Sequence, residues 1–254
     1  MPVPNFICIG VQKAGTSSLI NYLNQHPDIF MALDELHFFD KPKNYILENN
    51  DFSRYESNFN TDKQIIGEKT PSYNYLQFAI DRIHKYNSNM KLILILREPI
   101  SRAFSEYNMY LKFNNKKLSD VSEKEILEVF KEEEKYNLDE LENNGAYFIV
   151  RGFYDEIIEY ILKKFKKENL FIGISEEIIQ NKSKYYNNIF NFLNVKKIEI
   201  NEDDDTHKGN YDKNIPKILE KKLFKIYRPH NEKLYKLLGR KISIWEKYYE
   251  KFYN

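Results

Sequence analysis

The stretch from Phe6 to Leu19, FICIGVQKAGTSSL, decides the fold. Phe6–Ile9 is short, apolar and partly β-branched, which predicts a buried strand. Thr16–Gln25 has helical character, and Pro27 ends it. A strand that passes through a glycine loop into a helix gathers backbone N–H groups and the positive end of the helix dipole at one point. The stretch therefore predicts a site for an anion.

The position of the lysine shows which kind of phosphate loop this is. Loops that bind nucleoside triphosphates read GxxxxGK[ST], with the lysine directly after the second glycine, where it reaches the β- and γ-phosphates. Here Thr16 stands after Gly15, and the lysine comes earlier, at Lys13. The loop suits a phosphate-like group but departs from the pattern that binds ATP.

The rest of the chain alternates strand and helix patterns, which predicts an α/β fold with a parallel sheet. We expect further extended segments at Ile29–Ala32, Gln64–Gly67, Lys91–Leu96 and Leu170–Ile174. We expect helices at about Tyr75–Tyr86, Pro99–Lys112, Ile157–Lys167 and Tyr185–Leu193. Residues 114–143 are rich in lysine and glutamate with apolar residues at helical spacing, so we expect a helical insertion that acts as a lid or faces the substrate.

Composition predicts one domain over residues 1–254, because 42% hydrophobic residues can bury a substantial core. A formal net charge of +1 gives no sign of a nucleic-acid partner, so attraction for an anion must be local. The single cysteine, Cys8, cannot form an internal disulfide. We expect a cytoplasmic protein, because no run approaches transmembrane length and MPVPNFICIG lacks the features of a signal peptide.

Four blocks in order resemble the sulfotransferases that use 3′-phosphoadenosine 5′-phosphosulfate (PAPS), and the heparan-sulfate branch is the most similar. The blocks are QKAGT in the loop, DELHFFD at Asp34–Asp40, GEKTPSY at Gly67–Tyr73 and LILILREPISRAFSEY at Leu92–Tyr107. Tyr227–Leu238 and Trp245 resemble the closing helix and tryptophan of that family. The resemblance implies a P-loop-like three-layer fold, with a central parallel sheet flanked by helices.

The resemblance also implies a donor site. Lys13 would contact the 5′-phosphosulfate, and the 3′-phosphate would be held by Arg97, at the end of a strand, and Ser105. The full expected set is Lys13, Ala14, Gly15, Thr16, Ser17, Ser18, Arg97, Ser105, Lys208 and Gly209. Three alternatives are open: a solvated Lys13, an ion pair of Arg97 with Glu98 or Glu106, and a packing role for Ser105.

Lys208 and Gly209 stand where the family has a late loop that folds over the donor. The sequence here is THKGNYDK, so Asn210 replaces the arginine of the family, and the preceding disulfide loop is missing. The residue that would stack on adenine is not identified by the pattern.

On the acceptor side, the resemblance makes Glu35 the catalytic base, with Lys13, Lys69, His37 and Lys208 completing the expected catalytic set. A carboxylate in reach of the acceptor can take the proton that the attacking group loses. Glu35 as a loop carboxylate, a structural histidine at position 37 and a charge network of Lys69 with Glu68 are the alternatives. His37, Lys69, Arg151 and Tyr154 are expected to contact the acceptor, although Arg151 and Tyr154 can equally cap and pack the following helix.

We therefore expect an enzyme that transfers the sulfuryl group of PAPS by in-line displacement to a hydroxyl or amine of an acceptor, a carbohydrate by the resemblance. The product nucleotide would be 3′-phosphoadenosine 5′-phosphate (PAP), and no metal is expected because Lys13 supplies a cation. The alternatives are a P-loop nucleotide-dependent kinase, or an inactive relative that binds nucleotide or glycan.

Overall fold

The computed structural model describes residues 3–41, 52–141, 147–202 and 214–253. The chain divides into two compact units, which are described separately. Unit 1 comprises Met1–Leu96 and Tyr160–Lys208, and unit 2 comprises Arg97–Glu159 and Gly209–Asn254. The single functional domain expected from composition stays a prediction. No helix in the described ranges is both long enough and apolar enough to span a membrane.

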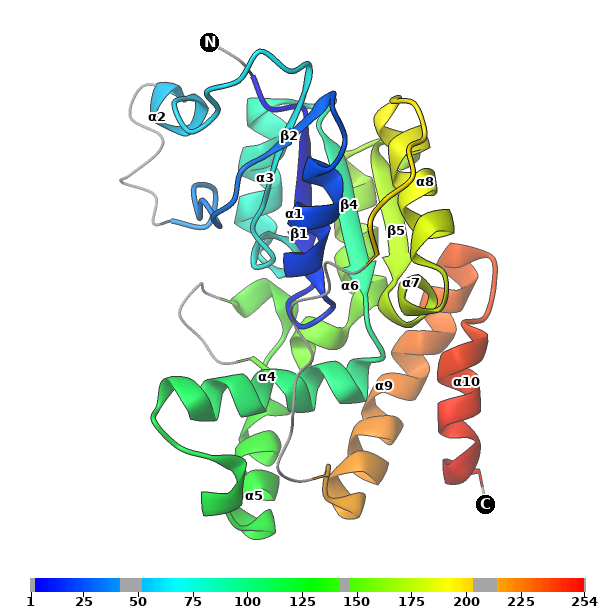
Figure 1. Cartoon of the computed structure of the whole chain (residues 1–254). Coiled ribbons are helices and arrows are strands. Elements are labelled where there is room, and N and C mark those ends of the chain that lie inside the picture. Colours follow the sequence, from blue (N-terminus) through cyan, green and yellow to red (C-terminus); the bar gives the residue numbers. More distant parts are fainter. Residues whose placement is uncertain (1–2, 42–51, 142–146, 203–213, 254) are drawn as a thin grey trace. The chain divides into compact units, whose positions relative to one another are not determined.

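Unit 1 is built on a parallel five-stranded sheet in the order β2-β3-β1-β4-β5 (Figure 1). The strands are β1 (Phe6–Gly10), β2 (Ile29–Met31), β3 (Ile65–Lys69), β4 (Lys91–Leu96) and β5 (Leu170–Ile174). β1 is buried throughout and β4 almost throughout, as expected for strands covered on both faces. The parallel sheet predicted from the sequence is confirmed.

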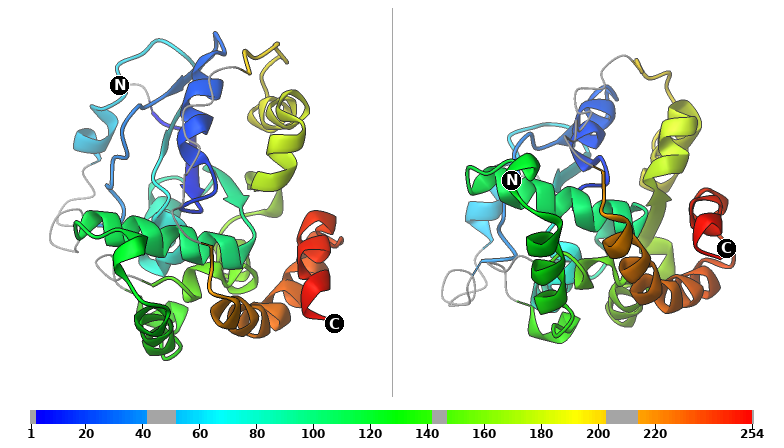
Figure 2. Two further views of the ribbon diagram at one scale, coloured as in Figure 1. Left: turned by 60° about the horizontal axis from the view of Figure 1, so that its bottom comes forward. Right: turned by 90° about the horizontal axis from the view of Figure 1, so that it is seen from below.

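Helices cover both faces of this sheet. α1 (Thr16–Asn24) carries the chain from β1 toward one edge, and α3 (Gln77–Tyr86) carries it from β3 in the opposite direction. Because such crossovers are right-handed, α1 and α3 lie on opposite faces. α8 (Lys182–Leu193) packs beside α1, and the last turns of α6 (Tyr154–Lys164) lie beside α3 (Figures 1 and 2). The unit thus has three layers.

Side-chain contacts join neighbouring helices on each face of the sheet. Tyr22 of α1 contacts Tyr186 of α8 with ring centroids 4.6 Å apart, and His26 contacts Phe190 at 5.0 Å. On the other face, Lys164 forms an ion pair with Asp81 of α3 at 2.8 Å. These contacts fix the helices over the sheet and hold the strand ends in place.

Unit 2 is mainly helical and contains α4 (Pro99–Phe113), α5 (Glu123–Glu133), α9 (Lys217–Leu238) and α10 (Ser243–Tyr249). Glu98 begins α4, because its carboxylate accepts hydrogen bonds from the backbone N–H groups of Ile100 and Ser101. The core of the unit contains an ionic cluster in which Glu106 pairs with both Arg102 and Arg151. The buried α5 residues Ile126 and Phe130 confirm the helix predicted within the insertion.

Four helical segments differ from the sequence prediction, and one of them, α6, begins at Tyr154, three residues before the predicted start. α9 begins at Lys217, ten residues before the predicted start, and contains Pro229 in its interior. Buried Leu219 and Leu223 anchor this earlier part, so packing overrides the break that the proline suggests. α7 (Ser175–Gln180) was not predicted, and α8 begins at Lys182, three residues early. The remaining short helices are α2 (Ser53–Glu56), η2 (Tyr73–Tyr75), η3 (Leu118–Asp120), η4 (Leu138–Glu140), η5 (Val150–Gly152), η6 (Lys167–Asn169) and η7 (Glu250–Phe252).

Candidate active site

The phosphate loop predicted between β1 and α1 has the backbone of an anion site. Gly15 is the N-cap residue of α1 with φ of 79°, a left-handed conformation that favours glycine. No side chain caps α1, and its first turn contains no acidic residue. The Ser18 N–H donates a 3.2 Å hydrogen bond to the Gly15 carbonyl, and the helix start, without a side-chain cap, suits an external anion. Lys13 also has a positive φ, 71°, which is costly for a lysine and typical of functional loops.

Position 10 also requires glycine, because a neighbouring side chain lies very close to the backbone there. A Cβ atom there would lie 2.3 Å from the Asn74 side-chain nitrogen, so a larger residue cannot fit. In the rest of the loop Ala14 and Thr16 are buried, whereas Gly15 and Ser17 are exposed. Ser18 and Lys13 lie between these extremes. Buried and exposed residues thus alternate, which anchors the loop and presents part of it to solvent.

The other predicted groups of unit 1 gather at the same edge of the sheet. The carboxyl ends of parallel strands meet at one edge, where open α/β folds bind ligands. Glu35 follows β2, and Lys69 is the last residue of β3, paired in register with Cys8 of β1, two residues before the loop. The sheet therefore brings Glu35 and Lys69, which are 34 positions apart, beside the start of the phosphate loop.

Glu35 lies between two cations. Lys69 Nζ is 2.5 Å from Glu35 Oε1, and His37 Nε2 is 3.4 Å from Glu35 Oε2. Partial burial raises the pKa of Glu35, but the hydrogen bonds from His37 and Lys69 outweigh it and hold the pKa below its ordinary value. Lys69 is 4% exposed, so its charge is directed at Glu35 and not at solvent. The carboxylate is ionised and oriented at neutral pH.

His37 is held by a carboxylate that we did not assign from the sequence. Asp40 is buried, and its Oδ2 lies 2.7 Å from His37 Nδ1 and accepts a 2.6 Å hydrogen bond from Ser72 Oγ. The hydrogen bonds to Asp40 and then to Glu35 raise the pKa of His37 to about 10. His37 has φ of 48°, so the backbone is not extended at this residue. The spacing of three residues from His37 to Asp40 was the signal available for this contact.

Glu68 lies next to Lys69 in the sequence but belongs to a different network. It is fully buried, and its carboxyl group accepts hydrogen bonds from Thr70 Oγ1 at 2.6 Å and Tyr55 OH at 3.3 Å. Burial raises the pKa of Glu68 to about 7. The Thr70 hydroxyl also accepts a hydrogen bond from the backbone N–H of His37 at 3.4 Å. Glu68 thus supports the segment that carries the site, and the ion pair of Lys69 is with Glu35.

The remaining described candidates lie in unit 2. Arg97 directly follows β4 in the sequence and is partly exposed, whereas Ser105 is buried on α4. Arg151 is buried and pairs with Glu106, and Tyr154 donates a 2.8 Å hydrogen bond to the Arg97 backbone carbonyl. Arg151 and Tyr154 therefore have structural partners, and their contact with an acceptor stays a prediction. Lys208 and Gly209 lie outside the described residues.

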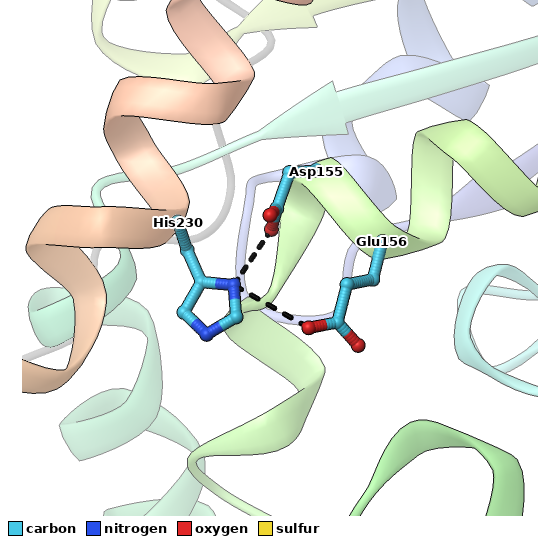
Figure 3. Close-up of side chains that lie close together, drawn as sticks. All are labelled: Asp155, Glu156 and His230. Atoms are coloured by element: carbon cyan, nitrogen blue, oxygen red, sulfur yellow. Dashed lines mark hydrogen bonds and ion pairs between the residues drawn. The ribbon is translucent and has the colours of Figure 1, made fainter.

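One group in the described part of the chain could supply metal ligands. His230 of α9 lies with Nδ1 2.8 Å from Asp155 Oδ1 and 3.6 Å from Glu156 Oε1 (Figure 3). Lys233 Nζ is 3.7 Å from the second oxygen of Asp155, and the His230 ring stacks on Phe153 at 3.8 Å. The lysine and the histidine already surround the Asp155 carboxylate. These contacts join α6 to α9 within unit 2.

Comparison with known proteins identifies the family. The model of the sulfotransferase family matches residues 2–235. Heparan sulfate glucosamine 3-O-sulfotransferase 5 of Mus musculus and of Homo sapiens are each 30% identical over 257 residues, which cover 95% of this chain and 74% of those proteins. A crystal structure of a sulfotransferase from Alicyclobacillus acidocaldarius aligns over 97% of this chain and all of that chain, with a TM-score of 0.77 and 25% identity. The chain belongs to the sulfotransferase family and is a PAPS-dependent sulfotransferase.

Proposed function

We propose that the protein transfers a sulfuryl group from PAPS to a hydroxyl or amine of a carbohydrate, with Glu35 as the base. The observation that carries this proposal is the ionised Glu35 carboxylate, held by Lys69 and His37 beside the phosphate loop. The carbohydrate acceptor is supported by relatives whose names describe sulfation of a glucosamine in heparan sulfate.

Glu35 would act on the attacking group of the acceptor. As the acceptor oxygen or nitrogen bonds to sulfur, its proton passes to Glu35, and the bond from sulfur to the bridging oxygen of the donor breaks. His37 and Asp40 position the carboxylate through the contacts of 3.4 and 2.7 Å. A well-placed general base contributes about 10²–10⁴-fold to a rate.

The phosphate loop would stabilise the leaving group. Negative charge develops on the departing 5′-phosphate, and Lys13 with the N–H groups at the start of α1 would balance it. The uncapped helix start and the positive φ of Lys13 support this role. Fixed donors of this kind need no reorganisation when the bond breaks.

The remaining assignments rest on the sequence resemblance. Arg97 and Ser105 would bind the 3′-phosphate, and Lys208 and Gly209 would add donor contacts. A guanidinium suits a phosphate because it can donate two parallel hydrogen bonds. A metal-independent reaction and a cytoplasmic location also stay predictions.

The test of the base is Glu35→Gln, with Asp34→Asn as the matched control in the same block. Transfer of labelled sulfate from PAPS to a panel of oligosaccharides should fall by about 10²-fold or more in Glu35→Gln. PAP binding, measured by calorimetry, should change little, because Glu35 is assigned to the acceptor side. Asp34 is exposed, so Asp34→Asn should keep both properties.

Two results would contradict the proposal. Wild-type transfer rates in Glu35→Gln would remove Glu35 as the base. Binding of ATP as tight as that of PAP, in wild type and in Arg97→Ala alike, would remove the assigned donor site.

A further inference from the structure

Unit 2 contains a two-part hollow between α4, α5 and the segment at Tyr147 and Phe148. The first part has a volume of about 480 Å³ and the second about 500 Å³, and both lie in the range of small-ligand sites. The two parts share Tyr110, Glu128 and Val129 as lining residues. The two neighbouring hollows are together called the α4–α5 groove, and Glu128 lines both of them.

Aromatic side chains line the first part of this groove. Tyr110, Tyr136, Tyr147 and Phe148 all contribute to its wall. Tyr136 meets Tyr147 edge to face at 5.0 Å, and Tyr110 meets Phe148 at 5.7 Å, so the rings hold one another in place. Aromatic faces of this kind bind cations by electrostatic attraction. They also offer flat apolar surface to a ligand.

The charged residues along the groove are nearly all acidic. The two parts are lined by five acidic residues and one basic residue, namely Asp120, Glu125, Glu128, Glu132 and Glu133 with Lys116. Burial raises the pKa of Glu133 to about 7, so the other four acidic residues supply the negative charge at pH 6. Residues 114–143 as a whole contain ten acidic and five basic side chains. A polyanionic chain would be repelled here, because like charges placed together cost free energy. A ligand with positive charges would be attracted.

Cations of the chain itself show how such a ligand would bind. Lys135 Nζ lies 3.1 Å from Glu132 and 5.4 Å from the centre of the Tyr136 ring. The Arg151 guanidinium lies 5.8 Å from the centre of the Tyr147 ring. Glu132 and the Tyr136 ring, which both line the groove, thus already have a cation, Lys135, beside them. Lys135 and Glu132 are both largely exposed, so their ion pair is weak and a ligand ammonium can replace it.

Glu128 is the carboxylate best placed for an incoming ligand. It is exposed, it lines both parts of the groove, and within the described residues it has no hydrogen bond or ion pair. Asp120 and Glu125, by contrast, cap the starts of η3 and α5. Glu133 accepts a 3.1 Å hydrogen bond from the backbone N–H of Ile149. Glu128 and Glu132 are therefore the two carboxylates to test.

We propose that the α4–α5 groove binds an acceptor saccharide that carries free amino groups, with the ammonium groups at Glu128 and Glu132 and the sugar rings on the tyrosines. This inference rests on the proposed function for the identity of the acceptor as a carbohydrate. It assigns the acceptor a positive charge, where a heparan-type chain is a polyanion. The acidic residues of the groove set this preference.

The test is calorimetric binding to the full chain of three tetrasaccharides of equal length. The probes are a glucosamine tetramer with four ammonium groups, its fully N-acetylated and neutral counterpart, and a sulfated heparin tetrasaccharide. At low salt and pH 6 the glucosamine tetramer should bind at least tenfold more tightly than either of the others. Its affinity should fall as salt rises, because exposed charges are screened.

Variants locate the site. Glu128→Gln with Glu132→Gln should weaken binding of the glucosamine tetramer at least tenfold and remove most of the salt dependence. The matched control, Glu123→Gln with Glu168→Gln, removes the same charge from exposed positions outside the groove and should bind as wild type does. Thermal unfolding confirms that both double variants are folded.

Three outcomes would overturn the inference: equal binding of the charged and neutral tetramers, a preference for the sulfated probe, or unchanged binding in the groove variant. Undetectable binding of the glucosamine tetramer would have the same effect. None of these measurements uses sulfuryl transfer. Failure of the proposed function would instead appear as loss of PAP binding or as full activity in Glu35→Gln, so the two failures are distinguishable.

Discussion

Glu68→Gln should change the pH dependence of stability by an amount that the structure fixes. Glu68 is a residue of β3 with no exposed surface, and its carboxyl group accepts hydrogen bonds from Thr70 and Tyr55. Burial, the largest influence, raises the pKa of its carboxyl group from 4.5 to about 7. The folded protein therefore favours the protonated acid, which is the form that glutamine imitates.

The sign follows from the order in which the two states titrate. Above pH 4.5 the unfolded chain loses the Glu68 proton while the folded chain keeps it up to about pH 7. Glu68 therefore lowers the free energy of unfolding as pH rises through this window, and its effect is constant above it. A tenfold difference in acidity is worth about 1.4 kcal/mol, so the full effect is about 3 kcal/mol.

Glutamine has no proton to lose, so this dependence should disappear in the variant. Relative to wild type, Glu68→Gln should gain about 3 kcal/mol of stability between pH 4 and pH 8. A constant loss of about 1 kcal/mol, from replaced hydrogen bonds, can apply at every pH. Urea unfolding followed by circular dichroism at pH 4, 5.5, 7 and 8 measures the difference. Exposed Glu123→Gln is the control and should track wild type. A Glu68→Gln difference that stays constant over this range would refute the reasoning.

Three further predictions concern the site and its support. His37→Gln removes a cation and a hydrogen bond that lower the Glu35 pKa, so the acid limb of the kcat/KM profile should move to higher pH. An unmoved limb would show that the two groups are not coupled. Gly15→Ala has room for its Cβ but must keep a positive φ, so urea unfolding should show a loss of about 1–2 kcal/mol, and calorimetry a weaker affinity for PAP. Glu106→Gln leaves two buried guanidinium groups with less compensation, so thermal and urea unfolding should show a loss of about 3–5 kcal/mol, and a loss below about 1 kcal/mol would contradict the buried pairing.

The sheet and the phosphate loop could be predicted because their signals are local. The apolar run at Lys91–Leu96 and the two glycines at positions 10 and 15 impose a strand and a loop wherever the chain places them. Helix boundaries were less certain. The resemblance placed the closing helix at Tyr227–Leu238, but the buried leucines of the preceding turns extend α9 upstream to Lys217. The packing that decides this start is not visible in a local pattern.

The contacts within the site could be predicted only in part. The ion pair of Lys69 with Glu35 joins the end of β3 to the segment after β2, whereas the sequence alone offered a charge network of Lys69 with Glu68. The alternation of side chains along β3 separates the two glutamates, because the adjacent residues Glu68 and Lys69 point to opposite faces of the sheet. Asp40 stood in a block that we had singled out, yet its contact with His37 needs the positive φ at position 37. A positive φ is uncommon for residues other than glycine, and no local pattern in the sequence indicated it.

The two cations beside Glu35, the proposed base, need a physical account, because they weaken this carboxylate as a proton acceptor. A general base works best when its pKa lies near the working pH, and the pKa of Glu35 is lowered. Each carboxylate oxygen has its own cation, Lys69 at Oε1 and His37 at Oε2. Under the proposed function, a group that brings negative charge to Lys69 would draw the ammonium from Oε1 and raise the Glu35 pKa. His37, fixed by Asp40, would still orient the carboxylate. The base would then gain strength when the donor is in place, which restricts proton removal to the complex that can use it.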